Sequence, residues 1–157
     1  KNFNRLGKNF VIEEVFALMR EGYNRTTFDG HKVSSIRSKR MMTFWKKGTF
    51  CVECCLHGTF FALEKFEEND VAHFNLYAVR GGEDVLMTRD HIIPRAKGGS
   101  DRLDNSQTMC VECNGKKGDS YKEPPKEEPK KPTLMYNLGD LLSERDETIY
   151  CVPFRRE

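Results

Sequence analysis

The stretch Cys110-Val111-Glu112-Cys113 repeats, residue for residue, the earlier stretch Cys51-Val52-Glu53-Cys54. Each Cys-x-x-Cys unit can present two thiolates to one ion, so two units complete the tetrahedral coordination that Zn²⁺ prefers. The separation between the units exceeds the roughly 15–20 residues usual in a zinc ribbon, which indicates that other elements are inserted between them. Because four sulfur ligands leave no open position, the predicted zinc is structural, although Cys55 or His57 could replace one ligand.

The composition is that of a soluble globular chain. Of the 157 residues, 38% are hydrophobic and 32% are charged, which excludes a fibrous or fully disordered protein. No window approaches the roughly 18 apolar residues of a membrane span, so no membrane partner is expected. Residues 1–10 lack the form of a secretory signal. The paired cysteines favour a metal site in a reducing compartment, and a cytoplasmic location is therefore expected.

The basic residues are unevenly distributed, although the net charge is only +2. Residues 31–48 contain six lysines and arginines and no acidic residue. A field of this sign attracts polyanions, and a solvated basic face is the plainer alternative. Within this segment we expect contacts to a polyanion from Arg37, Lys39, Arg40, Lys46 and Lys47.

Two helices are predicted before the first cysteine pair. Between Asn9 and Glu21 apolar residues recur at helical spacing, and Asn9 can cap the start. A second, basic helix is predicted from residue 34 or 35 to residue 47. Residues 1–50 are therefore expected to form an N-terminal helical region.

Between the cysteine pairs the pattern becomes strand-like. Phe60–Leu63, Ala72–Val79 and Val85–Met87 are rich in β-forming side chains and are separated by turn residues, which predicts three short antiparallel strands. A turn-rich loop at Lys97–Asp101 and a short helix from about Val111 follow. The expected fold class is α+β, with a core over residues 51–120.

After residue 120 the composition changes. Residues 121–132 contain four prolines among mixed charges, which predicts an extended linker. Residues 133–157 regain apolar content and are expected to be a C-terminal tail that packs on the body or binds a partner.

Asp90-His91, Asn105 and Asn114 stand between the cysteine pairs and directly after the second pair. On these residues, with Gly98-Gly99, the sequence resembles the HNH endonuclease family, also called ββα-metal or His-Me finger, in its branch with Cys-x-x-Cys pairs. The resemblance covers about Cys51 to Asp119. It implies a ββα-metal core with a four-cysteine zinc site, and hydrolysis of DNA phosphodiester bonds. It also implies a phage or mobile-element setting.

The chemistry of the four residues fits that activity. His91 has the pKa range to take a proton from water and is the expected general base. Asp90 and Asn114 offer the oxygen ligands that a hard ion needs, and Asn105 is expected to hold the loop and orient the His91 ring. Because the third family position is Asn114 rather than His, the set is His-Asn-Asn and favours Mg²⁺ or Mn²⁺.

DNA is the expected partner, bound mainly through phosphate contacts and therefore in a salt-dependent way. The oligomeric state, monomer or homodimer, stays open, and with it cleavage of one strand or both. Near the site further phosphate contacts are expected from Arg89, Arg95, Lys97, Lys116 and Lys117.

Two other functions stay open. The first is a catalytically inactive, zinc-dependent nucleic-acid-binding module. The intact set of Asp90, His91, Asn105 and Asn114 argues against it, because a retired site has no chemical reason to keep all four. The second is an interaction adaptor that works through residues 133–157, for which His91→Ala would be harmless.

Overall fold

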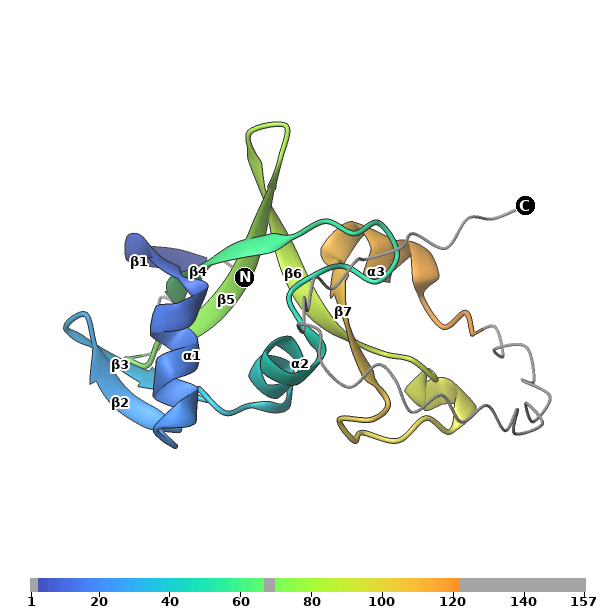
Figure 1. The fold of residues 1–157 in the computed structure, drawn as a ribbon, viewed down its shortest axis with the longest axis horizontal. Coiled ribbons are helices and arrows are strands. Elements are labelled where there is room, and N and C mark those ends of the chain that lie inside the picture. The colour runs from blue at the N-terminus through green and yellow to red at the C-terminus, as the bar shows by residue number, and fades with distance from the viewer. Residues whose placement is uncertain (1–2, 67–69, 122–157) are drawn as a thin grey trace, which may run out of the picture.

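A five-stranded antiparallel sheet forms the frame of the molecule (Figure 1). The structure is a computed structural model in which residues 3–66 and 70–121 are described. The strands lie in the spatial order β1-β4-β5-β6-β7. Their bounds are Phe3–Val11 (β1), Gly58–Phe66 (β4), His73–Arg80 (β5), Glu83–His91 (β6) and Ser106–Cys110 (β7). The three strands expected between the cysteine pairs are thus confirmed as β4, β5 and β6.

Three helices in the described part of the chain pack on this sheet, which confirms the mixed α+β class. Helix α1 (Ile12–Arg20) lies against β1 and β4, whereas α2 (Lys39–Lys47) and α3 (Val111–Lys117) lie against β6 and β7 (Figure 1). None of these described helices is long and apolar enough to cross a membrane.

The core lies between the sheet and the helices. Phe61 and Leu63 on β4 are fully buried, as are Val15 on α1 and Phe44 on α2. Each such side chain contributes about 1.5–3 kcal/mol when it leaves water. The core is continuous from α1 to the buried cysteines, so it fixes β6, β7 and α3 to the rest of the sheet.

The expected helix start at Asn9 is wrong, because the first strand continues to Val11. Asn9 and Phe10 pair with β4, and the Phe10 ring is buried against the aromatic core. The helix begins at Ile12, and the Glu14 side chain accepts a hydrogen bond from the Val11 N–H at 3.0 Å. The apolar residues at helical spacing all lie within α1, so the prediction misplaced only the start of the helix.

Residues 1–50 contain strands as well as the two expected helices. Besides β1, they form a hairpin of β2 (Arg25–Phe28) and β3 (His31–Ser34), and a bridge joins Val33 on β3 to Ala72, the residue before β5. Because β3 extends to residue 34, α2 starts only at Lys39, with Ser38 as its cap. The division of the chain at residues 50, 120 and 132 stays a prediction, and residues 122–157 lie outside the described part.

Strand β7 was not predicted, since Ser106-Gln107-Thr108-Met109-Cys110 has few β-forming side chains. It forms because β6 offers a complete antiparallel partner, with His91 opposite Ser106 and Met87 opposite Cys110. The Thr108 hydroxyl also donates to Gly48 O at 2.6 Å, which ties β7 to the end of α2. The chain therefore reaches α3 directly from a strand.

Candidate active site and cysteine cluster

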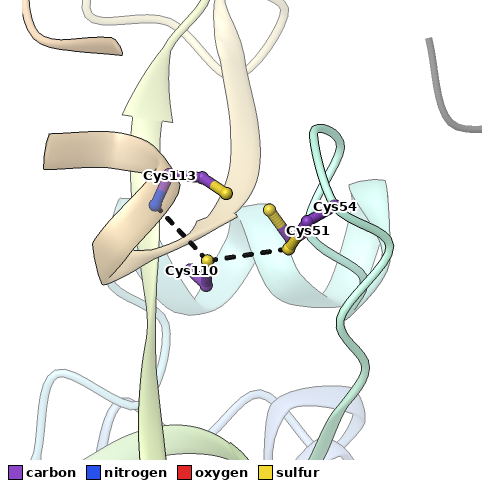
Figure 2. A group of neighbouring side chains, drawn as sticks. All are labelled: Cys51, Cys54, Cys110 and Cys113. Atoms are coloured by element: carbon purple, nitrogen blue, oxygen red, sulfur yellow. Dashed lines mark hydrogen bonds between the residues drawn. The ribbon is translucent and has the colours of Figure 1, made fainter. Parts of the chain in front are cut away.

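The two cysteine pairs meet in space. Figure 2 shows the sulfurs of one segment facing those of the other, and all four Sγ atoms lie within 4.8 Å of one another. A tetrahedron of Zn–S bonds of about 2.3 Å puts its sulfurs about 3.8 Å apart, and the Cys54 and Cys110 sulfurs are separated by 3.8 Å. The cluster is therefore suited to Zn²⁺, and its members are Cys51, Cys54, Cys110 and Cys113.

Neither of the alternative ligands belongs to this cluster. Cys55 has a left-handed backbone, with φ of 56°, at the end of the first turn. The His57 ring stacks on Phe50, with 4.1 Å between the ring centroids. The four-cysteine set is therefore the one that the described residues bring together.

The surroundings of the thiols affect their ionisation. Burial raises the pKa of Cys110 and Cys113. Burial also opposes ionisation of Cys54, but hydrogen bonds from the Leu56 amide and the neighbouring thiols lower its pKa to about 7. The Arg80 guanidinium donates to the Cys54 sulfur at 3.2 Å. A bound cation would provide the positive charge that the buried thiols lack.

Helix α3 lies on β6 so that one face of the helix meets one face of the strand. Thr88 and Asp90 are two residues apart and share a side of β6, while Asn114 and Lys117 are three apart and share a side of α3. Two contacts join these faces: Asn114 Nδ2 donates to Thr88 Oγ1 at 2.9 Å, and Lys117 Nζ lies 2.9 Å from Asp90 Oδ2. Asp90 and Asn114 thus lie on facing elements.

The Asn114 amide has a fixed orientation. Its nitrogen donates to the Thr88 hydroxyl, which itself donates to Met109 O at 2.9 Å and so can accept from Asn114. The amide oxygen is left as the acceptor that can bind a further group. Asn114 can therefore offer an oxygen to a hard ion.

Asp90 ends the buried part of β6 and is 7% exposed. Its Oδ2 accepts from Gln107 Nε2 at 2.7 Å, and both oxygens lie near the Lys117 ammonium, which also donates to His91 O at 2.7 Å. Lys117 was expected to contact DNA. In this structure the Lys117 side chain is 18% exposed and is directed to Asp90, and its contact with DNA stays a prediction.

His91 pairs with a carboxylate that sequence reasoning missed. Its Nε2 lies 3.1 Å from Asp101 Oδ1, and Asp101 also binds Lys39 and Arg89. Hydrogen bonds from Lys39, Arg89 and His91 hold the pKa of the Asp101 carboxyl well below its usual range. An ionised carboxylate can only accept, so Nε2 is the donor in this pair, and in a neutral ring Nδ1 is then the nitrogen without a proton. Asp101 stands in a turn-rich loop, where no periodicity marks a functional residue.

Asn105 holds the loop that follows His91. Its Oδ1 accepts from Ile93 N at 2.8 Å, and its Nδ2 donates to Ile93 O and Ser100 O. The loop is so tight here that a Cβ on Gly99 would lie 1.8 Å from Ile93 O. These contacts agree with the predicted loop-holding role. The His91 ring donates its hydrogen bond to the loop carboxylate of Asp101 rather than bonding to Asn105.

Two arginines among the expected DNA contacts face inward. Arg40 donates to Phe74 O at 2.9 Å, and burial lowers the pKa of its guanidinium, so its predicted role needs correction. Arg89 is 13% exposed and binds Asp101 and Ser106. The exposed members of the set are Arg37, Lys39, Lys46, Lys47, Arg95, Lys97 and Lys116.

A groove of about 580 Å³ adjoins the His91–Asp101 pair. Arg37, Lys39 and Arg102 line it together with two carboxylates, Asp101 and Asp104, and Met42 and Leu103 are its apolar lining. Lys39 is paired with Asp101, and Arg102 lies 3.6 Å from Asp104. The groove therefore carries one more positive than negative side chain, and this small excess favours an anion.

The segment that contains Asp90, His91, Asn105 and Asn114 is similar to a known protein family. Residues 81–129 match the family model described as HNH endonuclease, whereas no curated protein and no solved structure matches the chain. The match includes β6, β7 and α3, whose order gives the ββα core that this family implies. The first cysteine pair precedes the matched segment and contacts it through the four-cysteine cluster. Residues 81–129 therefore form a domain of the HNH endonuclease family.

Proposed function

We propose that this protein is a metal-dependent endonuclease that hydrolyses DNA phosphodiester bonds. The observation that carries the proposal is the meeting of β6 and α3, which brings Asp90 and Asn114 onto facing elements, with His91 next to Asp90 at the end of the strand. Membership of residues 81–129 in the HNH endonuclease family supports a nuclease activity.

In this proposal His91 is the general base. Its Nδ1 takes a proton from a water molecule, while Nε2 stays bonded to Asp101. The hydroxide attacks phosphorus, the bond to the leaving oxygen breaks, and that oxygen receives a proton from solvent. Asp101 keeps the proton on Nε2 throughout, so the ring returns to its starting state when Nδ1 releases its proton.

Asp90 and Asn114 would hold Mg²⁺ or Mn²⁺. A carboxylate and an amide oxygen suit a hard ion, and the Lys117 ammonium shows that a cation already fits beside the Asp90 carboxylate. A divalent ion bound there supplies the charge that stabilises the phosphoryl group and the leaving oxygen. The cysteine cluster would hold a separate, structural Zn²⁺, because its four sulfurs leave no open position.

DNA would lie across the groove at Arg37, Lys39 and Arg102, with further contacts from the exposed Arg95 and Lys97 in the loop after His91. These side chains can bind phosphates without reading base sequence, so affinity should fall steeply with salt. Cleavage of one strand or both depends on whether the protein acts as a monomer or a homodimer.

One observation favours a second function, an inactive nucleic-acid-binding module. The Asp90 carboxylate already carries the Lys117 ammonium, and a permanent pair of this kind would leave no place for a divalent ion. The two functions share the cysteine cluster and the exposed basic residues, and they differ in catalysis.

Cleavage of supercoiled plasmid separates them. The parent protein should nick or linearise plasmid in Mg²⁺ or Mn²⁺, and His91→Ala should lower the rate by about 10²- to 10⁴-fold, as expected for loss of a general base. The His91→Ala protein should keep the parent's zinc content and melting temperature. Equal cleavage by both proteins would exclude His91 as the base. Binding without cleavage in either ion would support the inactive module.

A further inference from the structure

The Lys117 ammonium lies at the place where the proposed divalent ion would bind. It is 2.9 Å from Asp90 Oδ2 and 3.1 Å from Oδ1, so it faces the carboxylate squarely. It also donates to the carbonyl oxygen of His91 at 2.7 Å. Three acceptor oxygens therefore surround one cation.

The pair is well protected from solvent. The Asp90 side chain is 8% exposed and that of Lys117 is 18% exposed. A buried carboxylate needs a partner charge or several hydrogen bonds, and Asp90 has Lys117 and the Gln107 amide. Lys117 thus neutralises Asp90 in this structure.

The carboxylate has little room for a second cation while Lys117 stays. Oδ2 accepts a hydrogen bond from Gln107, and Oδ1 accepts one from Lys117. The acceptor position that each oxygen keeps lies next to the ammonium, which is 2.9 Å from Oδ2 and 3.1 Å from Oδ1. An ion of charge +2 at either position would be repelled by the Lys117 charge at close range.

We propose that Lys117 is a resident counter-ion that competes with the divalent ion for Asp90. Binding of the ion requires the ammonium to leave the carboxylate, and this requirement lowers the affinity of the free protein for the ion. Lys117 is the last residue of α3 and precedes Gly118, whose φ is 49°, so the side chain leaves the site without unwinding the helix. The proposal rests on the proposed function, since it assumes that Asp90 binds the ion.

Mn²⁺ affinity measured by electron paramagnetic resonance tests the competition without DNA and without catalysis. The full zinc-loaded chain is titrated with Mn²⁺ as the parent, as Lys117→Met and as Lys116→Met. Removing the competing charge should lower the Kd of Lys117→Met by about tenfold. Lys116→Met removes an equal charge from an exposed neighbour and should bind like the parent, because solvent screens that charge.

Lys117→Arg provides a second control, since it keeps a cation at this position and should bind Mn²⁺ no more tightly than the parent. Zinc content and the melting temperature verify folding of each variant. If Lys117→Met does not fold, Lys117→Gln carries the same test, because its amide is neutral and polar.

Asp90→Asn distinguishes the two levels of the proposal. If Asp90→Asn loses Mn²⁺ binding but Lys117→Met binds with the parent's affinity or more weakly, the counter-ion role is wrong and the ion site stands. If Asp90→Asn binds Mn²⁺ like the parent, Asp90 is not the ligand and the proposed ion site fails as well. Tighter binding by Lys117→Met together with loss in Asp90→Asn supports both.

Discussion

The cysteine cluster and the active centre share α3 but differ in construction. Cys113 and Asn114 are neighbours on this helix, so one element contributes to both sites. The cluster consists of four identical donors, mostly buried, whose sulfurs could complete the coordination of one ion. The active centre mixes a carboxylate, an amide and an imidazole, and each of these is already paired with another protein group. The cluster therefore serves stability, and the active centre keeps groups that can change partners.

This difference predicts the largest effect at the cluster. Cys110→Ser should lose zinc and cooperative folding, since structural zinc contributes roughly 10–16 kcal/mol apparent in small zinc-binding peptides. Zinc analysis and thermal unfolding by circular dichroism measure both losses. The active-centre variant His91→Ala, with its zinc intact, is the matched control. A Cys110→Ser protein that melts at the parent's temperature would show that the cluster is dispensable for the fold.

A smaller, purely catalytic effect is expected at Asp101. An asparagine there can donate its amide N–H to His91 Nε2, which stabilises the tautomer with the proton on Nδ1 and removes the base. Asp101→Asn should lower kcat by about tenfold to hundredfold, because the ring no longer presents its base correctly. KM for DNA should not rise, since losing the carboxylate leaves Lys39 free for phosphate.

Steady-state cleavage by Asp101→Asn is best compared with that by Asp119→Asn. Asp119 is exposed, so its substitution changes the net charge equally and should leave kcat unchanged. An unchanged kcat in Asp101→Asn would mean that the His91–Asp101 pair does not set the tautomer in the working enzyme.

Much of this organisation could be predicted from local sequence. The paired cysteines and the series Asp90-His91, Asn105 and Asn114 are patterns of spacing along the chain. Such patterns can be recognised in the sequence without knowing how the chain packs. Strand β7 could not be predicted from its own residues, because it forms through pairing with β6. The extension of β1 to Val11 likewise depends on β4.

The charged residues show most clearly what local sequence does not predict. Arg40 and Lys117 are basic residues of the kind that DNA-binding surfaces contain. In the folded protein Arg40 instead donates to Phe74 O, and Lys117 pairs with Asp90. Asp101 has no distinguishing pattern in its turn, and its proposed role depends on the contact with His91, ten residues earlier. Whether a charge meets solvent or a buried partner is a property of the folded chain.

The smallest expected effect comes from comparing an exposed and a partly buried basic residue on α2. Lys46→Ala removes an exposed cation. The slope of log binding constant against log salt concentration should therefore become less steep by about 0.9, the change expected for the loss of one phosphate contact. Arg40→Ala should leave that slope unchanged and cost about 1 kcal/mol of stability through the lost bond to Phe74 O. Fluorescence anisotropy over a salt series and urea unfolding measure the two quantities. If Arg40→Ala changed the salt slope and Lys46→Ala did not, Arg40 would be the residue that contacts DNA.

The central claim is that a hard-ion centre cleaves DNA beside a separate zinc cluster. Its most direct measurement is plasmid cleavage by protein that has been treated with a mild chelator and still contains one zinc per chain. We expect no cleavage by this protein, and full cleavage after Mg²⁺ or Mn²⁺ is added, with the zinc content unchanged. Cleavage before any divalent ion is added, or no cleavage after Mg²⁺ and Mn²⁺ have both been supplied, would contradict the claim.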